Sequence, residues 1–291
     1  MLFPFLSVAR SLRAAEIGGL KIKKIALTAG LEKPIKFLQI SDVHYVFSDA
    51  RDDGFTQELA RKRFKSFRNA DKYFTQAISY AKENGELAVI TGDFYDFANP
   101  KTLEECKKKL DGTDYVFAVG NHEFSQYVGS RPEEANFRNK IYPEVQKVFK
   151  NSLEFSARVY GGVNFVCVDN SNYRFTLRQF EKLKAEIEKG MPTIVAFHIP
   201  IYTPALYDKY RKPGGGLVQM AGVPEKVSGA KTNISPDALT VEFAEYLKTC
   251  KNVVAVICGH KHAYGEDAFG CTREFVCGCA AKGEVCEFTL V

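Results

Sequence analysis

The sequence lacks any run of 18 or more consecutive apolar residues, so no membrane-spanning helix is expected. It also lacks internal repeats and low-complexity tracts. The apolar segment at residues 1–6 is short, and Arg10 and Arg13 follow it rather than precede it, which is the wrong order for a secretory signal. We therefore expect one domain over residues 1–291, with an N-terminal extension over about residues 1–20, no membrane partner and a cytoplasmic location.

The eight cysteines include no Cys-x-x-Cys pair, and disulfide frameworks belong mainly to short secreted chains. Cys167 and Cys258 lie in apolar runs, where they are expected to act as small buried hydrophobic residues. Cys277 and Cys279 alternate, which predicts that both face one side of a strand. We expect reduced thiols, and we find little support for a second metal site at these C-terminal cysteines.

The formal net charge of +5 is compatible with anionic substrates and is too small to indicate nucleic-acid binding by itself. One basic run, Arg61–Arg63 with Lys65 and Arg68, falls in a segment with helical periodicity. We interpret this run as the solvated face of an amphipathic helix, and nucleic-acid binding by these residues is the less favoured alternative. The sequence carries no indication of oligomeric state.

Strand and helix patterns alternate along the chain, which indicates an α/β fold with much parallel sheet. Strands are expected at residues 19–28, 34–40, 87–90, 115–119, 163–168, 193–197 and 253–258, with two more between 273 and 291. Helices are expected at residues 56–83, 101–110, 177–189 and 236–250.

One long irregular stretch, residues 200–235, contains three consecutive glycines at 214–216. Long loops in compact domains are usually functional, and this one follows His198 directly, so we expect it to form a flap over the functional site. Its aromatic and basic side chains would either contact a nucleotide or simply pack the flap; they are Tyr202, Tyr207, Tyr210 and Arg211.

All five histidines lie just beyond the end of an expected strand, beside Asp, Asn or Gly: His44, His122, His198, His260 and His262. In α/β sheets the chemistry collects beyond the carboxyl ends of the strands, so these side chains should converge. Imidazole combined with carboxylate suits Mn, Fe, Zn or Co rather than Ca. Two such ions about 3.5–4 Å apart form a clamp for in-line displacement at phosphorus. A carboxylate between the ions is needed to offset their repulsion.

Five short motifs occur in order, each after an expected strand, and together they resemble the calcineurin-like metallophosphoesterase superfamily. The resemblance covers residues 37–264. Asp42–His44 matches its D-x-H motif, residues 92–96 match G-D-x-x-D, and residues 120–123 match G-N-H-[DE]. His198 is the lone histidine after a strand, and residues 259–262 match G-H-x-H. The resemblance implies a single-domain, four-layer αββα sandwich of two mixed sheets flanked by helices.

The resemblance also implies a role for each residue. The first metal would be held by Asp42, His44 and His262, the second by Asn121, His198 and His260, and Asp93 would bridge them. His122 would be the general acid, oriented by Asp96, which accepts its other N–H. In the implied mechanism a hydroxide bridging the two metals attacks phosphorus in line, and His122 protonates the departing alkoxide.

At two positions this chain departs from the motifs of known branches of the superfamily, which narrows the set of expected relatives. Purple acid phosphatases carry Tyr where this chain has Asp96, and they lack the histidine that His44 supplies here. Phosphoprotein phosphatases follow the second Asp with Arg-Gly, whereas Phe97–Ala98 follow Asp96. The expected kin are therefore the small bacterial-type phosphoesterases and cyclic-nucleotide phosphodiesterases.

These features predict a hydrolase that uses two divalent or trivalent transition-metal ions, Mn, Fe or Zn, on a small soluble phosphomonoester or phosphodiester. The alternatives are a metal-dependent nuclease and a catalytically idle metal-binding scaffold for a protein partner. A scaffold would be expected to lose ligands, and none is missing here.

Overall fold

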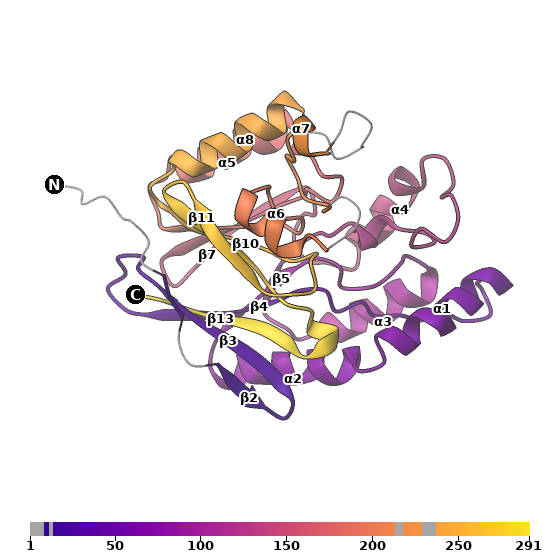
Figure 1. The fold of residues 1–291 in the computed structure, drawn as a ribbon. Coiled ribbons are helices and arrows are strands. Elements are labelled where there is room, and N and C mark those ends of the chain that lie inside the picture. The colour runs from indigo at the N-terminus through magenta and orange to yellow at the C-terminus, as the bar shows by residue number, and fades with distance from the viewer. Residues whose placement is uncertain (1–8, 12–13, 213–217, 229–236) are drawn as a thin grey trace.

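Two mixed β-sheets pack face to face, and helices cover the outer side of each sheet (Figure 1). The computed structural model describes residues 9–11, 14–212, 218–228 and 237–291. The layers alternate helix, sheet, sheet and helix, so the prediction of a four-layer α/β sandwich is confirmed. Within these described ranges, no helix is both long enough and apolar enough to cross a bilayer.

The first sheet contains seven strands and joins the two ends of the chain. Its order is β1 (Ala9–Ser11), β3 (Leu20–Leu27), β13 (Glu284–Leu290), β4 (Ile35–Ile40), β5 (Leu87–Thr91) and β6 (Tyr115–Ala118), with β2 (Ala15–Ile17) paired to β3. β4, β5 and β6 run parallel, whereas β13 is antiparallel to β4. The described part of the N-terminal extension, residues 9–11 and 14–20, thus adds strands to this sheet.

The second sheet contains six strands. Its order is β11 (Gly265–Phe269), β12 (Thr272–Val276), β10 (Val253–Cys258), β9 (Thr193–Ala196), β8 (Val163–Val168) and β7 (Phe155–Tyr160). β8, β9, β10 and β12 are parallel, and the two edge strands are antiparallel to their neighbours. The carboxyl ends of β9 and β10 therefore lie at one edge of this sheet.

Alternating side chains on each strand divide the core into layers. On β5, Leu87 and Val89 point into the layer between the sheets, whereas Ala88 and Ile90 pack under the helices of the first sheet. Because both faces of the central strands are buried, their sequences are continuously apolar, as expected for covered parallel sheets.

The helices differ from the expectation in two places. The segment 56–83 forms two helices, α1 (Gly54–Ser66) and α2 (Ala70–Glu83), rather than one. Phe67 lies at the break and stacks on the His44 ring with centroids 4.4 Å apart. Helix α4 (Phe137–Gln146) was not expected. The other long helices occur as expected: α3 (Pro100–Leu110), α5 (Leu177–Ile187) and α8 (Ala238–Thr249).

The stretch 200–235 is less irregular than expected. Its described part contains α6 (Pro204–Tyr210) and α7 (Glu225–Ser228), and Ile201 bridges Ala221; residues 213–217 and 229–235 lie outside the described ranges. Tyr202 and Tyr207 pack edge to face with centroids 5.6 Å apart, so they hold this segment together. The Tyr210 hydroxyl donates to the carbonyl of Ala263 at 3.0 Å, beside His262.

The C-terminal tail contains the two expected strands, β12 and β13, but sequence patterns missed β7 and β11. Cys277 and Cys279 follow the end of β12, so the prediction that they share a strand face is wrong. The Cys279 thiol instead donates to the carbonyl of Asp42 at 3.2 Å. All eight cysteines are free, and seven of them are buried.

Glu274 on β12 is a fully buried carboxyl, and burial raises its pKa from 4.5 to about 8. The folded chain therefore keeps a proton that the unfolded chain releases, so this group opposes folding increasingly as the pH rises from about 4.5 to 8. We expect Glu274→Gln to stabilise the protein at pH 8 by about 1 kcal/mol or more, with little effect at pH 4.5. Thermal denaturation across this pH range tests the prediction, and a variant less stable than the wild type at pH 8 would contradict it.

Candidate metal centre

The residues predicted to form the site lie beyond the carboxyl ends of strands from both sheets. β4, β5 and β6 of the first sheet lead to Asp42, Asp93 and His122, and β9 and β10 of the second lead to His198 and His260. Gln39 links the two sheets just below the site, since its amide donates to the Thr91 hydroxyl at 3.0 Å and to the Cys258 carbonyl at 2.9 Å. These side chains therefore meet at the shared edge of the two sheets.

Asp42, His44 and His262 form the first group of ligand atoms, which lie within 4.8 Å of one another. His262 Nε2 lies 3.1 Å from Asp42 Oδ1 and 2.9 Å from His44 Nε2. Asp42 and His44 are fully buried, whereas the His262 side chain is about one-third exposed. These are the three residues that the sequence assigned to the first metal.

Asp93, His198 and His260 form the second group. His198 Nε2 lies 3.0 Å from Asp93 Oδ2, and His198 Nδ1 lies 2.7 Å from the Thr91 carbonyl, which orients the ring. Asn121, the residue before His122, has a side-chain oxygen that is buried without a hydrogen-bond partner in the described structure.

A third group, His44, Asp93 and His122, connects the other two because it shares one member with each. Asp93 Oδ2 lies 3.9 Å from Nε2 of both His44 and His122. The carboxylate of Asp93 therefore lies close to ligand atoms of both other groups, at 3.9 Å from His44 Nε2 and 3.0 Å from His198 Nε2.

The carboxylate of Asp96 contacts different partners from those expected. His122 Nδ1 lies 2.6 Å from the Asp96 backbone carbonyl and 3.4 Å from its carboxylate. The carboxylate lies closer to His44 Nδ1, at 3.0 Å, and accepts two hydrogen bonds from Arg63 at 2.6 and 2.8 Å. Asp96 thus orients His122 mainly through its main chain and orients the predicted metal ligand His44 through its side chain.

Arg63 was expected on a solvated helix face, and this expectation is wrong. Arg61 and Lys62 are exposed and pair with Glu58, but Arg63 points inward to Asp96. Its forked guanidinium matches the carboxylate geometry and places a fixed positive charge behind His44. No sequence pattern distinguished Arg63 from the neighbouring basic residues of α1.

Arg63→Ala should leave the buried carboxylate of Asp96 without its cation. We expect a loss of about 2 kcal/mol in the free energy of unfolding, less than for a fully buried pair because one-third of the Arg63 side chain is exposed. Arg61→Ala, on the same helix, is the matched control and should cost less than about 0.5 kcal/mol. Equal losses of unfolding free energy for the two variants, measured by urea denaturation, would contradict a stabilising role for the Arg63–Asp96 pair.

The backbone is strained at the site. Among the described residues, eight non-glycine residues have positive φ, and five of them are predicted metal ligands: Asp42, His44, Asp93, His260 and His262. Such conformations cost about 1–3 kcal/mol each and persist where the surrounding structure enforces them. Gly92 reaches φ +79° immediately before Asp93, where a Cβ atom would lie 2.6 Å from His198 Nδ1. A side chain at this position is therefore incompatible with the site.

Two buried side chains hold these strained loops, and sequence reasoning gave neither of them a role. The Glu123 carboxylate accepts backbone N–H groups of Asp93, Phe94 and Gly120 at 2.7–3.0 Å. The Asn170 side chain accepts from the N–H groups of His198 and Ile199 and donates to the Ile199 carbonyl. Asn170 follows the end of β8, so the strand-end signal that marked the histidines could have marked it too.

Opposite charges dominate the electrostatics of the centre. Burial alone would raise the pKa of Asp42, but His262 and His44 outweigh it and hold the pKa well below the ordinary value. Burial alone would lower the pKa of the histidines, yet Asp93 and its neighbours raise the pKa of His122 to about 10 and that of His198 to about 9. Metal binding at the predicted ligand His198 would release its proton, because a ligating imidazole must be neutral at the coordinating nitrogen.

Unpartnered polar atoms test whether the residues fit metal ions. Asp42 Oδ1, Asn121 Oδ1 and His198 Nε2 are buried and form no hydrogen bond within the described structure. Buried polar atoms are normally satisfied, and all three belong to side chains assigned as ligands. Their chemistry, carboxylate and amide oxygens with imidazole nitrogens, suits a first-row transition metal. The site therefore fits two such ions.

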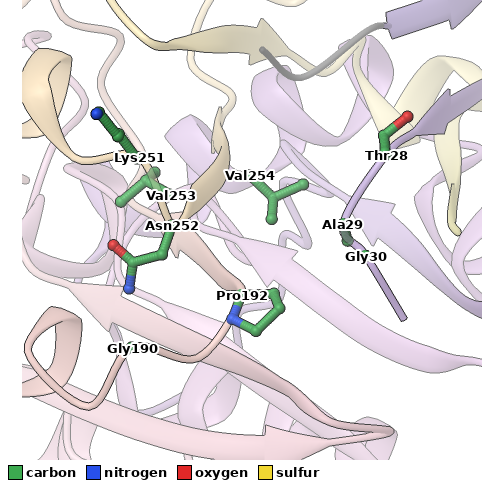
Figure 2. Close-up of a pocket in the computed structure, with 9 residues that line it drawn as sticks. All are labelled: Thr28, Ala29, Gly30, Gly190, Pro192, Lys251, Asn252, Val253 and Val254. Carbon is green, nitrogen blue, oxygen red and sulfur yellow. The ribbon is translucent and has the colours of Figure 1, made fainter. Parts of the chain in front are cut away.

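Two cavities differ in their relation to this centre. Figure 2 shows a cavity of about 230 Å³ at the amino ends of β9 and β10, lined by Pro192, Asn252 and Val254 among others. Lys251 is its only charged lining residue, and it precedes β10, whereas His260 follows the carboxyl end of that strand. A larger cavity of about 620 Å³ is lined by His260 and His262 themselves. The substrate approach is therefore expected on that side.

A strand-end centre of imidazoles and carboxylates in a four-layer sandwich is the architecture of a metal-dependent phosphoesterase. The sequence matches the calcineurin-like phosphoesterases over residues 35–264, and the chain belongs to this family. It is therefore a metal-dependent hydrolase of phosphoesters. No curated protein matches the chain by sequence.

Solved structures align with this chain at low sequence identity. A structure of PhoD aligns with a TM-score of 0.52 and 13% identity, covering 90% of this chain and 60% of that chain. A dimetal phosphatase from Danio rerio aligns with a TM-score of 0.48 and 14% identity, covering 85% and 88%. A 5′-nucleotidase described as putative, from Staphylococcus aureus, aligns with a TM-score of 0.44 and 14% identity, covering 85% and 49%.

Proposed function

We propose that the protein hydrolyses a small soluble phosphomonoester or phosphodiester at a dinuclear metal centre. The observation that carries this proposal is the set of three ligand groups linked through Asp93 and His44. In our assignment Asp42, His44 and His262 hold one ion. Asn121, His198 and His260 hold the other, and Asp93 lies between them.

The two ions, when bound, supply Lewis acidity that activates a water molecule and neutralises charge on the phosphoryl oxygens. The protein's own residues orient the substrate and move the proton. His122 is the proposed general acid, because its Nδ1–H donates to the Asp96 carbonyl and its Nε2 faces the centre. Its side chain is 17% exposed, so a leaving oxygen could reach it.

Mn, Fe and Zn are the metals we propose, since the imidazole and oxygen donors of the site suit all three. We also propose a cytoplasmic location, because eight free cysteines are typical of proteins from reducing compartments. A nuclease is less favoured, because three cations of the basic run, Arg61, Lys62 and Arg63, pair with Glu58 and Asp96. An idle scaffold is less favoured because the predicted carboxylate and imidazole ligands fall into close groups.

Hydrolysis of 4-nitrophenyl phosphate and of bis(4-nitrophenyl) phosphate tests the proposal. Metal-stripped protein would be refilled separately with Mn²⁺, Fe²⁺ and Zn²⁺, and metal content would be measured alongside turnover. Metal-dependent cleavage of the monoester indicates a phosphatase, and cleavage of the diester indicates a phosphodiesterase. Two bound metals with no turnover of these or of other small phosphoesters would overturn the proposal in favour of the scaffold.

A further inference from the structure

The cavity of about 620 Å³ beside the metal centre is lined by an excess of positive charge. Its lining includes five cationic side chains and no acidic one: Lys209, Arg211, Lys212, Lys261 and Lys282. They come from three separate parts of the chain, namely the end of α6, the His260–His262 loop and the 3₁₀ turn at Ala280–Lys282. We call this feature the basic cavity.

No ion pair within the described residues neutralises these five cations. Among the described residues, Lys261 donates to the carbonyl of Gln219 at 3.4 Å and lies 5.7 Å from the Tyr210 ring centroid, and Lys209 lies 6.0 Å from the Tyr264 ring centroid. Elsewhere on the surface, basic side chains are commonly paired, as Arg51 is with Asp49 and Glu104. Cations gathered around a concave wall repel one another and concentrate the field, which favours an anionic ligand.

The basic cavity opens directly onto both halves of the metal centre. His260 and His262 line it, and each belongs to a different ligand group. Lys261 lies between these two histidines in the chain. A substrate with one phosphoryl group at the metal centre would thus place its adjoining part in the basic cavity. The cavity volume falls within the range of about 300–1,000 Å³ typical of small-molecule sites, which is more than one phosphate needs.

We propose that the basic cavity binds a second phosphoryl group, so that the natural substrate is a small molecule with at least two of them. One phosphoryl group is hydrolysed at the metals, and the other is held by Lys209, Arg211 and Lys212. This inference rests on the proposed phosphoester hydrolysis and narrows its substrate class. It also explains why cations from three chain segments meet where the metal loop ends.

Non-hydrolysable phosphonates test the binding separately from the chemistry. The probes are pentylphosphonate, which has one phosphonate group, and pentane-1,5-bisphosphonate with its three- and four-carbon homologues. Isothermal titration calorimetry on the Mn²⁺-loaded protein would measure the affinity of each probe. We expect at least one bisphosphonate to bind with an affinity about tenfold or more above that of the monophosphonate. The reason is that hydrogen bonds between a cationic side chain and an anionic phosphonate are stronger than those between neutral groups.

The variant Lys209→Gln/Arg211→Gln/Lys212→Gln removes the three cations contributed by the α6 end. We expect the preference for the bisphosphonate to fall to about threefold or less. The matched control is Lys107→Gln/Lys108→Gln/Lys147→Gln, which removes the same charge from exposed positions on α3 and directly after α4. The control variant should keep the wild-type preference for the bisphosphonate over the monophosphonate. If the triple variant does not fold, Arg211→Gln and Lys282→Gln as single changes should each reduce the preference.

Equal affinity of wild type for both kinds of probe would overturn the inference, as would an undiminished preference in the cavity variants. Tighter binding of a short single-stranded oligonucleotide than of any bisphosphonate would overturn it in favour of a nucleic-acid site. A clear bisphosphonate preference without hydrolysis of any phosphoester would support the cavity and overturn the proposed function instead.

Discussion

Replacing Asp93 by Asn is expected to reduce metal-dependent hydrolysis by about 10³-fold or more while the chain stays folded. Asp93 is the only carboxylate shared by two of the three ligand groups, and its Oδ2 lies 3.0 Å from His198 and 3.9 Å from His44. An amide lacks the negative charge that offsets repulsion between two cations. Losing several kcal/mol of charge stabilisation in the transition state corresponds to this fall in rate.

The Asn side chain should preserve the local structure. Asp93 Oδ1 accepts the backbone N–H of His122 at 3.0 Å, and an amide oxygen can accept the same bond. The readouts are kcat/KM for 4-nitrophenyl phosphate at saturating Mn²⁺ and the number of metals per chain by mass spectrometry. We expect fewer than two metals to be retained.

Asp71→Asn is the matched control, because it makes the same chemical change at a carboxylate that pairs with Lys109 outside all three ligand groups. It should keep both metals and full activity. Full metal content together with activity within tenfold of wild type in Asp93→Asn would show that the bridging assignment is wrong.

The strand-end positions of Asp42, Asp93 and His198 were predictable because they depend on two local facts. Continuous apolar runs identify buried strands, and in α/β sheets polar residues beyond their carboxyl ends meet at one edge. The sandwich of two sheets required the family resemblance, since periodicity alone indicates only alternating helices and strands. β7 and β11 were missed because their polar, partly exposed sequences at sheet edges lack the apolar run that marked the central strands.

Arg63 shows what local patterns could not supply. Its contact with Asp96 depends on the turn between α1 and α2. Residues 67–69 contain no Pro or Gly, so the sequence did not indicate a turn there. The same break brings Phe67 onto the His44 ring. Glu123 was in a recognised motif, but its role as acceptor of three backbone N–H groups follows only from the folded loops. Contacts made by common residue types across the fold were therefore beyond sequence analysis.

Replacing His122 by Gln should slow hydrolysis in a manner that depends on the leaving group. A general acid contributes about 10²–10⁴-fold when the departing oxygen must be protonated. An alkyl phosphate releases a basic alkoxide, so we expect a loss within that range. 4-Nitrophenyl phosphate releases a weakly basic phenolate that needs no proton, so the loss should be about tenfold or less.

The number of metals bound per chain distinguishes proton donation by His122 from metal coordination by the same side chain. His122 belongs to one ligand group with His44 and Asp93, but our assignment gives it no place among the ligands of either ion. His122→Gln should therefore keep two metals per chain, whereas His198→Gln, the matched change at a predicted ligand, should lose metal and slow both substrates. Equal losses on alkyl and 4-nitrophenyl phosphates in His122→Gln would argue against proton donation. Loss of metal in the same variant would instead assign His122 to coordination, and Asp96 would then orient two metal ligands, one through its carbonyl and one through its carboxylate.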